Sequence, residues 1–360
     1  MQKSMKILFL TRLYWPHVGG VEKHVYSLST SLSTRGHRVT VLTTQYDKKL
    51  KSREKRDGIQ IIRFKQPGIK YLGLFYTWHW LLKNIDLIKE SDIIHIHDVF
   101  IWYLPFRILF PRKPVYTTFH GRWGKYPIPF SDIIQKRLGA KLSKGVISIG
   151  EYIPRNYGFK SDITLYGAVN KVQNSKFKIQ NDKSIHSASS GLMLSKVEAS
   201  KFKIIYVGRL DNDIALDIVL EAFSKLSGYD FEFIGDGEKR KECEKYGKVH
   251  GFTDPTPFYK KAKFCFASGY LTIHEALANK CLVFVAYRHP LQRDYYKLTP
   301  FSKFIYSSDN PEKLAERLLY LNKNKKAAQK LIDAGYNWVK TQTWEKLTNS
   351  YLKLWGIKTT

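Results

Sequence analysis

The stretch KILFLTRLYWPHVGGVEKHVYSLSTSLSTRGHRVTVLTT, residues 6–44, decides the fold. It opens with an apolar, β-forming run (6–11) and closes with a second one (37–44). Between them, apolar residues recur at helical spacing: Val21, Val25, Leu28 and Leu32. Gly36 fits the end of that helix. Strand, helix and strand in this order predict a parallel sheet with helices on its faces.

The same alternation continues through the first half of the chain and returns in the second half. Further buried strands are expected at IQIIRF, DIIHIHD, PVYTTFH and GVISIG, and later at FKIIYVGRL, YDFEFIGDG, KVHGF, KFCFAS and LVFVA. A polar, Ser- and Lys-rich stretch from Lys171 to Lys201 separates the two halves and is typical of a linker or surface insertion. The tail, residues 311–355, has helical spacing of Leu and Ala. Two doubly wound domains are therefore predicted, with ligands at the carboxyl ends of their strands.

Charge is the most unusual feature of the composition. Sixty Lys and Arg against 31 Asp and Glu give a formal net charge of +29 in 360 residues. This excess points to an anionic partner: a phosphorylated substrate, lipid headgroups or nucleic acid. A compositional bias of the genome would also produce it. Because we find no RNA- or DNA-binding signature, no nucleic-acid partner is expected.

Targeting signals and cysteines favour a cytoplasmic protein. The N-terminus lacks a cleavage site, and no segment is apolar enough for a membrane span. Three unpaired cysteines (Cys243, Cys265 and Cys281) argue for a reducing compartment and against a zinc site. The segment 63–89 mixes Trp, Tyr and Leu with lysines, so it could rest on an anionic bilayer, peripherally at the inner face of the cell membrane. The alternative is a helix that packs its aromatic side chains against its own sheet.

Gly19 and Gly20 lie between the first strand and the first helix. Glycine lets backbone amides approach a ligand, and a helix N-terminus attracts phosphate. A tight turn with positive φ explains the pair equally well. It is neither a dinucleotide fingerprint, because Lys23 stands where the third glycine belongs, nor a P-loop.

The second half carries more specific motifs. IIYVGRL ends a strand in Gly-Arg, FEFIGDG ends one in Gly-Asp-Gly, and SGYLTIHEALANK has a glycine loop before a helix with Glu275. Together with the opening motif, TTFHG, YGAVN and QTWEKL, they follow one another in an order that resembles family 4 of the retaining glycosyltransferases. That resemblance covers nearly the whole chain and implies the GT-B fold.

The resemblance implies four parts of the chain. They are an acceptor-side Rossmann-like domain (1–168), a linker or insertion (169–200), a nucleotide-sugar domain (201–330), and C-terminal helices bracing the first domain (331–360). It also implies a UDP- or GDP-linked sugar as donor, no cofactor and no metal. We accordingly read the Asp-Asn-Asp at 211–213 as a loop.

The resemblance also assigns roles to individual residues. Arg209 would hold the diphosphate and stabilise the leaving group, Glu275 would bind the ribose, and His120 would face the donor sugar. Backbone amides would contact the diphosphate at the remaining donor-binding positions: Gly19, Gly20, Gly235, Ser268, Gly269, Tyr270, Leu271 and Thr272.

Two departures from the family pattern matter. Ala267 occupies the place of the first of two glutamates, and Ile214 that of a lysine in the loop after the GRL motif. Losing one charge-assisted donor costs about 1.5–3 kcal/mol. Arg288 and Arg293, in and after the loop that follows LVFVA, could compensate.

Other polar residues near strand ends are ambiguous. His95 and His97 alternate along a strand, so we expect only one of them to face the cleft, and a role in the core is favoured. Asp98 is a candidate at the end of the same strand. Glu151 either lines the cleft or caps a helix.

The sequence therefore predicts a metal-independent, retaining hexosyltransferase that transfers sugar from a nucleotide-diphospho-sugar to a lipid-linked or saccharide acceptor. The alternative is a degenerate protein of the same fold that acts as a nucleotide- or membrane-binding scaffold. A nucleic-acid-binding module is a further alternative supported by charge alone. The sugar, the nucleotide base, the acceptor and the oligomeric state are not determined by the sequence.

Overall fold

The structure, a computed structural model, describes residues 4–69, 72–121, 125–170 and 203–358. These residues form two compact units. The first comprises residues 1–167, 290–299 and 344–360, and the second residues 168–289 and 300–343. Nearly all of the predicted linker, residues 169–200, lies outside the described residues.

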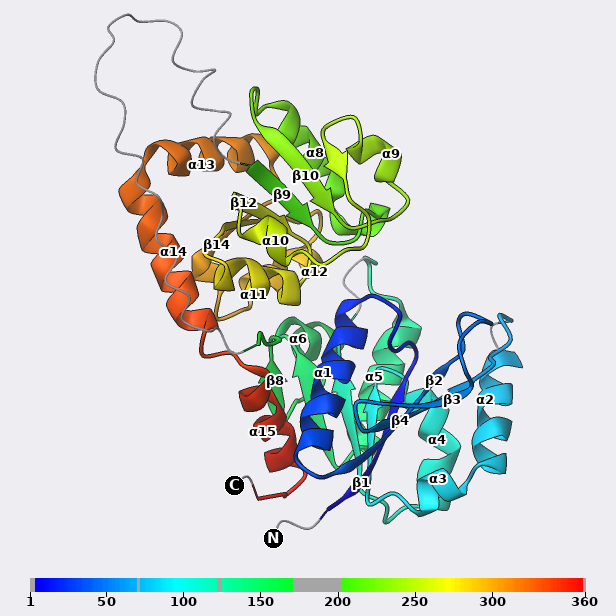
Figure 1. Ribbon diagram of the computed structural model, residues 1–360. Coiled ribbons are helices and arrows are strands. Elements are labelled where there is room, and N and C mark those ends of the chain that lie inside the picture. The colour runs from blue at the N-terminus through cyan, green and yellow to red at the C-terminus, as the bar shows by residue number, and fades with distance from the viewer. Residues whose placement is uncertain (1–3, 70–71, 122–124, 171–202, 359–360) are drawn as a thin grey trace, which may run out of the picture. The chain divides into compact units, whose positions relative to one another are not determined.

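The first unit is built on an eight-stranded sheet in the order β3-β4-β2-β1-β5-β6-β7-β8 (Figure 1). Its strands are β1 (Lys6–Thr11), β2 (Arg38–Thr44), β3 (Arg53–Arg56), β4 (Ile59–Phe64), β5 (Ile93–His97), β6 (Val115–Phe119), β7 (Gly145–Ile149) and β8 (Ile163–Leu165). All of its pairs are parallel except β3 with β4. The edge strand β3 was not predicted, because its sequence REKR has no apolar alternation.

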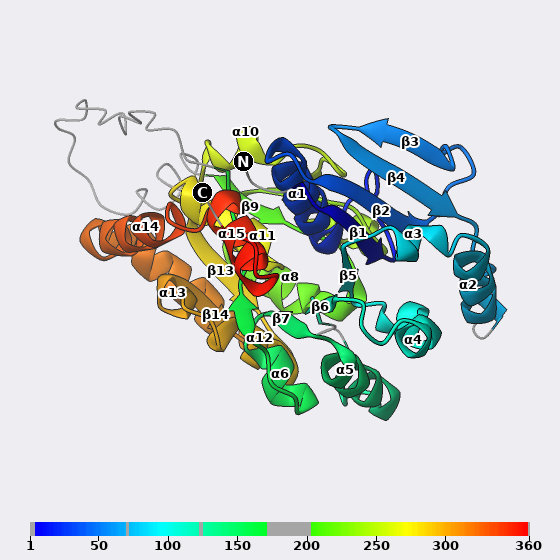
Figure 2. The ribbon, with the colours of Figure 1, turned by 90° about the horizontal axis from the view of Figure 1, so that it is seen from below.

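Helices cover both faces of this sheet (Figure 2). They are α1 (Gly20–Thr34), α2 (Leu72–Lys83), α3 (Asp86–Lys89), α4 (Phe100–Leu109), α5 (Phe130–Leu142), α6 (Tyr152–Tyr157), α12 (Pro290–Lys297) and α15 (Trp344–Leu354). One core lies between the sheet and α2, α3 and α4, and it includes Leu8, Ile94 and Ile96. The residues between these along the strands, such as Phe9 and His95, face the other way, toward α15.

The second unit contains a six-stranded, all-parallel sheet in the order β11-β10-β9-β12-β13-β14. Its strands are β9 (Lys203–Val207), β10 (Asp230–Ile234), β11 (Lys248–Val249), β12 (Ala262–Ala267), β13 (Leu282–Ala286) and β14 (Ile305–Ser308). Its α-helices are α8 (Leu216–Ser224), α9 (Arg240–Cys243), α10 (Thr256–Tyr259), α11 (Tyr270–Ala278), α13 (Pro311–Lys323) and α14 (Lys325–Val339). Two 3₁₀ turns complete the chain: η1 (Asn212–Ile214) and η2 (Ser302–Phe304).

The predicted bracing segment, residues 331–360, divides between the units. Helix α14 packs on α11 in the second unit, where Gly335 approaches Leu277. Helix α15 packs on α1 in the first unit, and Thr348 Oγ1 donates to Ser31 Oγ at 3.0 Å. The chain therefore returns to its first unit only after Thr343.

Candidate active site

Three neighbouring strands of the second unit end in the residues predicted to bind the donor. Arg209 follows β9, Gly235 follows β10 and Ser268 follows β12, and the sheet order places β9 between the other two. Tyr206 connects two of these loops, since its hydroxyl donates to the Arg209 carbonyl oxygen at 2.9 Å and is hydrogen-bonded to the Ser268 side chain. Burial raises the pKa of Tyr206, so the hydroxyl stays a proton donor there. The predicted donor residues of this unit therefore share one edge of the sheet.

Glycines let these loops approach one another. Gly208 and Gly235 have φ of 152° and 154°, and a Cβ on Gly235 would lie 1.8 Å from the Gly208 carbonyl oxygen. No side chain fits at that distance, so Gly235 is required for the contact between the two loops. This gives Gly235 a structural reason to be glycine, in addition to its predicted contact with the donor.

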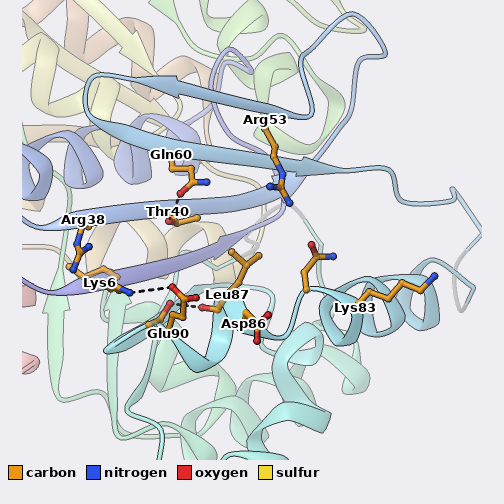
Figure 3. Close-up of a pocket in the computed structure, with 12 residues that line it drawn as sticks. Lys6, Arg38, Thr40, Arg53, Gln60, Lys83, Asp86, Leu87 and Glu90 are labelled. Carbon is orange, nitrogen blue, oxygen red and sulfur yellow. Dashed lines mark hydrogen bonds and ion pairs between the residues drawn. The ribbon is translucent and has the colours of Figure 1, made fainter.

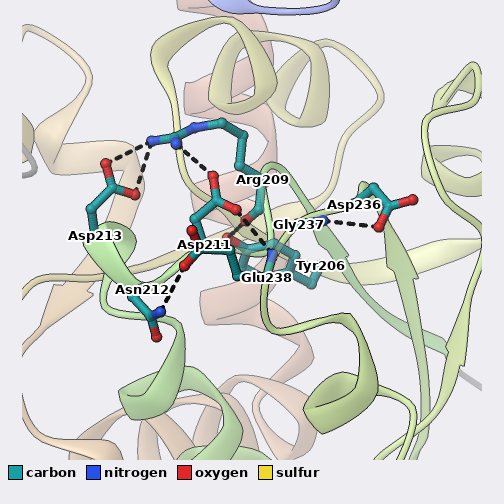
Figure 4. Close-up of polar contacts among 8 residues, drawn as sticks. All are labelled: Tyr206, Arg209, Asp211, Asn212, Asp213, Asp236, Gly237 and Glu238. Carbon is teal, nitrogen blue, oxygen red and sulfur yellow. Dashed lines mark hydrogen bonds and ion pairs between the residues drawn. The ribbon is translucent and has the colours of Figure 1, made fainter.

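Arg209 is held by two carboxylates (Figure 4). Its Nη1 donates to Asp211 Oδ2 at 2.6 Å, and its Nη2 lies 3.1 Å from each oxygen of Asp213. About half of the Arg209 side chain is exposed. A diphosphate that takes up the guanidinium fork must therefore compete with carboxylates already in place. Sequence reasoning missed these partners, although their spacing of two and four residues from Arg209 was visible.

The loop between β12 and α11 leads into the N-terminus of α11. Thr272 folds back on Gly269, accepting from its N–H at 3.1 Å and donating to its carbonyl at 2.7 Å. The amides of a helix's first turn have no acceptor within the helix, and the helix dipole favours an anion there. The Tyr270 ring is buried against Phe301, so Tyr270 can serve a ligand only through its backbone. Leu271 is partly exposed in the same turn.

Glu275 lies on the second turn of α11. It is partly buried, and the Tyr259 hydroxyl donates to its Oε2 at 3.4 Å. Ala267, where the family has its first glutamate, is the last residue of β12 and is 4% exposed. One carboxylate of the usual pair is therefore present, and a small apolar side chain occupies the other position.

Ile214 and the two arginines expected to compensate occupy different surroundings. Ile214, in place of the lysine, is 3% exposed in η1, just before Ala215 with its left-handed φ of 51°. Arg288 pairs with Asp217 in α8, within the second unit. Arg293 lies in α12 of the first unit and pairs with its neighbour Asp294 at 3.2 Å. The structure thus does not bring the two arginines into one unit.

In the first unit, the predicted glycines open α1. Gly19 is the N-cap residue with an extended φ of −177°, and Gly20 is the first helical residue. The positive-φ explanation of this pair is therefore wrong. A Cβ on Gly20 would meet no described atom within 4 Å, which leaves the backbone of the first turn accessible from that side.

His120 follows β6 and is held from three directions. Its N–H donates to Asp98 Oδ2 at 3.1 Å, its carbonyl accepts from Tyr152 at 3.2 Å, and its Nε2 lies 3.0 Å from His97 Nδ1. Asp98 itself accepts from Lys136 Nζ at 2.9 Å. Desolvation lowers the pKa of His120 to about 4, against Asp98, which raises it. His120 is therefore a neutral hydrogen-bonding group at neutral pH.

The expectation that only one of His95 and His97 faces the cleft is wrong. Residues two apart on a strand point to the same face, and their ring centroids lie 5.0 Å apart. Both are buried, as a core role requires. Glu151 occupies the N-cap position of α6 without a side-chain cap, and its Oε2 accepts from Thr164 at 3.2 Å.

A buried hydrogen-bond chain joins these histidines to α1 and to the C-terminal residues. Trp355 Nε1 lies 3.1 Å from His95 Nδ1, His95 Nε2 2.7 Å from Thr118, Thr118 3.0 Å from Tyr351, and Tyr351 2.8 Å from His24 Nε2. Because the indole N–H only donates, His95 Nδ1 must accept, and the donors then run in one direction to His24. Every histidine in this chain must be neutral. His24 was missed by sequence reasoning, although it follows Val21 by three residues on the apolar face of α1.

A separate hollow of about 440 Å³ lies at the opposite, amino-terminal edge of the first sheet (Figure 3). Its walls are formed by β1, β2, β3 and β4 and by the turn between α2 and α3. None of the predicted site residues lines it. It is therefore distinct from the candidate active site.

Both units match known glycosyltransferase profiles. Residues 18–157 match Glycosyltransferase Family 4, and residues 195–338 match Glycosyl transferases group 1. The chain belongs to the family 4, group 1 glycosyltransferases. It is similar to a phosphatidylinositol N-acetylglucosaminyltransferase of Arabidopsis thaliana, with 21% identity over 262 residues, 70% of this chain and 56% of that protein. The chain thus spans about half the length of the curated relatives it matches.

Solved structures show the same GT-B fold. A sucrose-phosphate synthase from Thermosynechococcus elongatus matches with a TM-score of 0.73 and 15% identity over 98% of both chains. Anabaena HepE in complex with UDP-glucose matches with a TM-score of 0.69 and 14% identity, over 97% of this chain and 99% of that one. The predicted family and fold are therefore confirmed, and the protein is a GT-B glycosyltransferase.

Proposed function

We propose that this glycosyltransferase transfers a hexose from a nucleotide-diphospho-sugar to a lipid-linked or saccharide acceptor, with retention of configuration and without a metal. The observation that carries the proposal is the convergence of Arg209, the N-terminus of α11 and Glu275 on adjacent strand ends of one sheet. A guanidinium and a helix N-terminus suit a diphosphate, and a carboxylate suits ribose hydroxyls. HepE, a structure with the same fold, is in complex with UDP-glucose.

The chemistry asks three things of the residues in place. Arg209 and the first-turn amides of α11 neutralise the diphosphate as it leaves, which is the main electrostatic need of the transition state. Glu275 orients the nucleotide through its ribose. In the first unit, neutral His120, fixed by Asp98, Tyr152 and His97, offers a hydrogen bond to a sugar hydroxyl.

Binding of nucleotides by the whole chain tests the donor site. Calorimetry with UDP, GDP, ADP and their common sugar conjugates is expected to show one diphosphate that binds clearly. Replacing Arg209 with alanine removes a charge-assisted contact and should weaken that binding about 10- to 100-fold. Arg240→Ala is the matched control, because Arg240 also pairs with two carboxylates, Asp236 at 2.8 Å and Glu244 at 2.9 Å, but lies on α9. Equal losses in the two variants would contradict the assigned role.

Asp213→Asn is expected to tighten nucleotide binding about fivefold. The half-exposed carboxylate competes with the diphosphate for Arg209 Nη2, and an amide has no charge to compete with. Calorimetry with the diphosphate identified above measures the change, and exposed Asp333→Asn on α14 serves as its control. Weaker binding would mean instead that Asp213 orients the guanidinium for the ligand.

A degenerate scaffold is the second candidate function. The buried side chains of Ala267 and Ile214 favour it, because neither can contribute a charge to the donor. It predicts that no diphosphate of the panel binds and that no donor is turned over or hydrolysed.

A further inference from the structure

Helix α2 is apolar on two faces, and only one of them is packed. Gly73, Thr77 and Leu81 are buried, and Trp78 and Trp80 pack against the core of the first unit. A second row, at spacings of three and four residues, is exposed; we name it the α2 outer row, and it consists of Leu72, Phe75, Tyr76, His79, Leu82 and Lys83. Phe75 is 62% exposed and Leu72 57%. The segment 63–89 thus divides its aromatic residues between the core and the surface.

An apolar row of this kind is unusual on a soluble surface. An exposed helix normally presents polar residues to water, and contiguous apolar surface marks a binding site. More exposed apolar side chains lie close by in the chain or on a contacting helix. Ile69 leads into α2, and Ile108 and Leu109 end α4, which packs against α2.

Charge indicates what the α2 outer row contacts. Lys83, the last residue of the row, also lines the hollow at the amino-terminal edge of the sheet (Figure 3). Lys6, Arg38 and Arg53 line it as well, against two carboxylates, Asp86 and Glu90. Lys6 pairs with Glu90 at 3.2 Å, whereas the side chains of Lys83, Arg38 and Arg53 have no ion-pair partner among the described residues. An apolar row that ends at a basic hollow matches a surface that is apolar inside and anionic at its boundary.

We propose that the α2 outer row docks on an anionic phospholipid bilayer, with headgroup phosphates held by Lys83, Arg38 and Arg53. The apolar side chains enter the boundary between headgroups and acyl chains. The cations lie at the level of the phosphates. This deepens the proposed function by naming a membrane as the source of a lipid-linked acceptor, and rests on that function for the acceptor alone. No helix in the described part of the chain could span a bilayer, so the contact proposed is peripheral.

Vesicle flotation with the full chain and no nucleotide sugar tests the docking. Binding is expected to vesicles of phosphatidylcholine with 30% phosphatidylglycerol, and to be at least tenfold weaker to phosphatidylcholine alone. Leu72→Ser with Phe75→Ser should weaken the anionic binding about tenfold or more. Lys83→Gln, Arg38→Gln and Arg53→Gln together should weaken it about as much.

Matched controls separate the α2 outer row from general stickiness and general charge. Phe252→Ser removes a 58% exposed aromatic ring from the second unit, and Lys326→Gln with Lys330→Gln removes two exposed charges from α14. Both should leave vesicle binding unchanged. The proposal is overturned if anionic vesicles are not bound, if neutral vesicles bind equally well, or if the controls lose as much as the α2 variants. Because nucleotide calorimetry uses no lipid, failure of the donor site is seen separately.

Discussion

Acidification from pH 7 to pH 4 is expected to lower the free energy of unfolding by an amount on the order of 5 kcal/mol, comparable to the whole stability of many domains. The buried histidines of the first unit are the cause. Desolvation lowers the pKa of His95 to about 3 and of His120 to about 4, and places those of His24 and His97 well below the ordinary value of 6.5.

The sign follows from proton binding. Between the lowered pKa of the folded state and about 6.5, the unfolded chain binds protons that the folded chain does not, so stability falls as the pH falls. Each such histidine contributes up to about 1.4 kcal/mol per pH unit in that window. The contribution is fully present above pH 6.5 and is lost by about pH 3 to 4. The donor direction gives the same sign independently, because a proton added to His95 Nδ1 would face the Trp355 N–H.

Urea unfolding at pH 7, 6, 5 and 4 measures this dependence. His120→Asn should flatten the slope below pH 6.5 by as much as about 1.4 kcal/mol per unit, even if the variant is less stable at pH 7. His79→Asn removes an exposed histidine from α2 and serves as the control. An unchanged slope in His120→Asn would show that His120 is not held neutral by the fold.

Ile214→Lys is expected to destabilise the second unit by about 3–4 kcal/mol. The substitution restores the residue type of the family pattern, but Ile214 is 3% exposed. A lysine there loses the apolar burial and removes an ammonium group from bulk water. The departure from the pattern is therefore a change of the loop's packing, not the loss of one surface contact.

Thermal and urea unfolding of Ile214→Lys measure the cost, and Ile108→Lys, at a position 77% exposed, is the control. The control should change the stability by less than about 0.5 kcal/mol. If Ile214→Lys unfolds like the wild type and binds nucleotide more tightly, its side chain reaches the donor, and the simple loss of a charge was the correct interpretation.

Local sequence patterns determined the architecture. Apolar runs separated by helical spacing identified the central strands of both sheets, because a parallel strand buried on two faces must be apolar throughout. Glycine-containing strand ends, such as those at Gly208 and Gly235, located the candidate site, since only glycine allows two loops to approach so closely. The partners of Arg209 could also have been found, because Asp211 and Asp213 are adjacent in the chain.

Tertiary structure alone decided the features that depend on contacts between distant segments. Tyr351 reaches His24 across 327 residues, and no local pattern shows that α15 closes the buried hydrogen-bond chain. Helix α2 is apolar all round, so its sequence could not tell which row packs on the sheet and which stays exposed. Ile214 reads as a missing charge in an alignment and as a packed side chain in the fold. Burial is set by what covers a residue, and the cover comes from elsewhere in the chain.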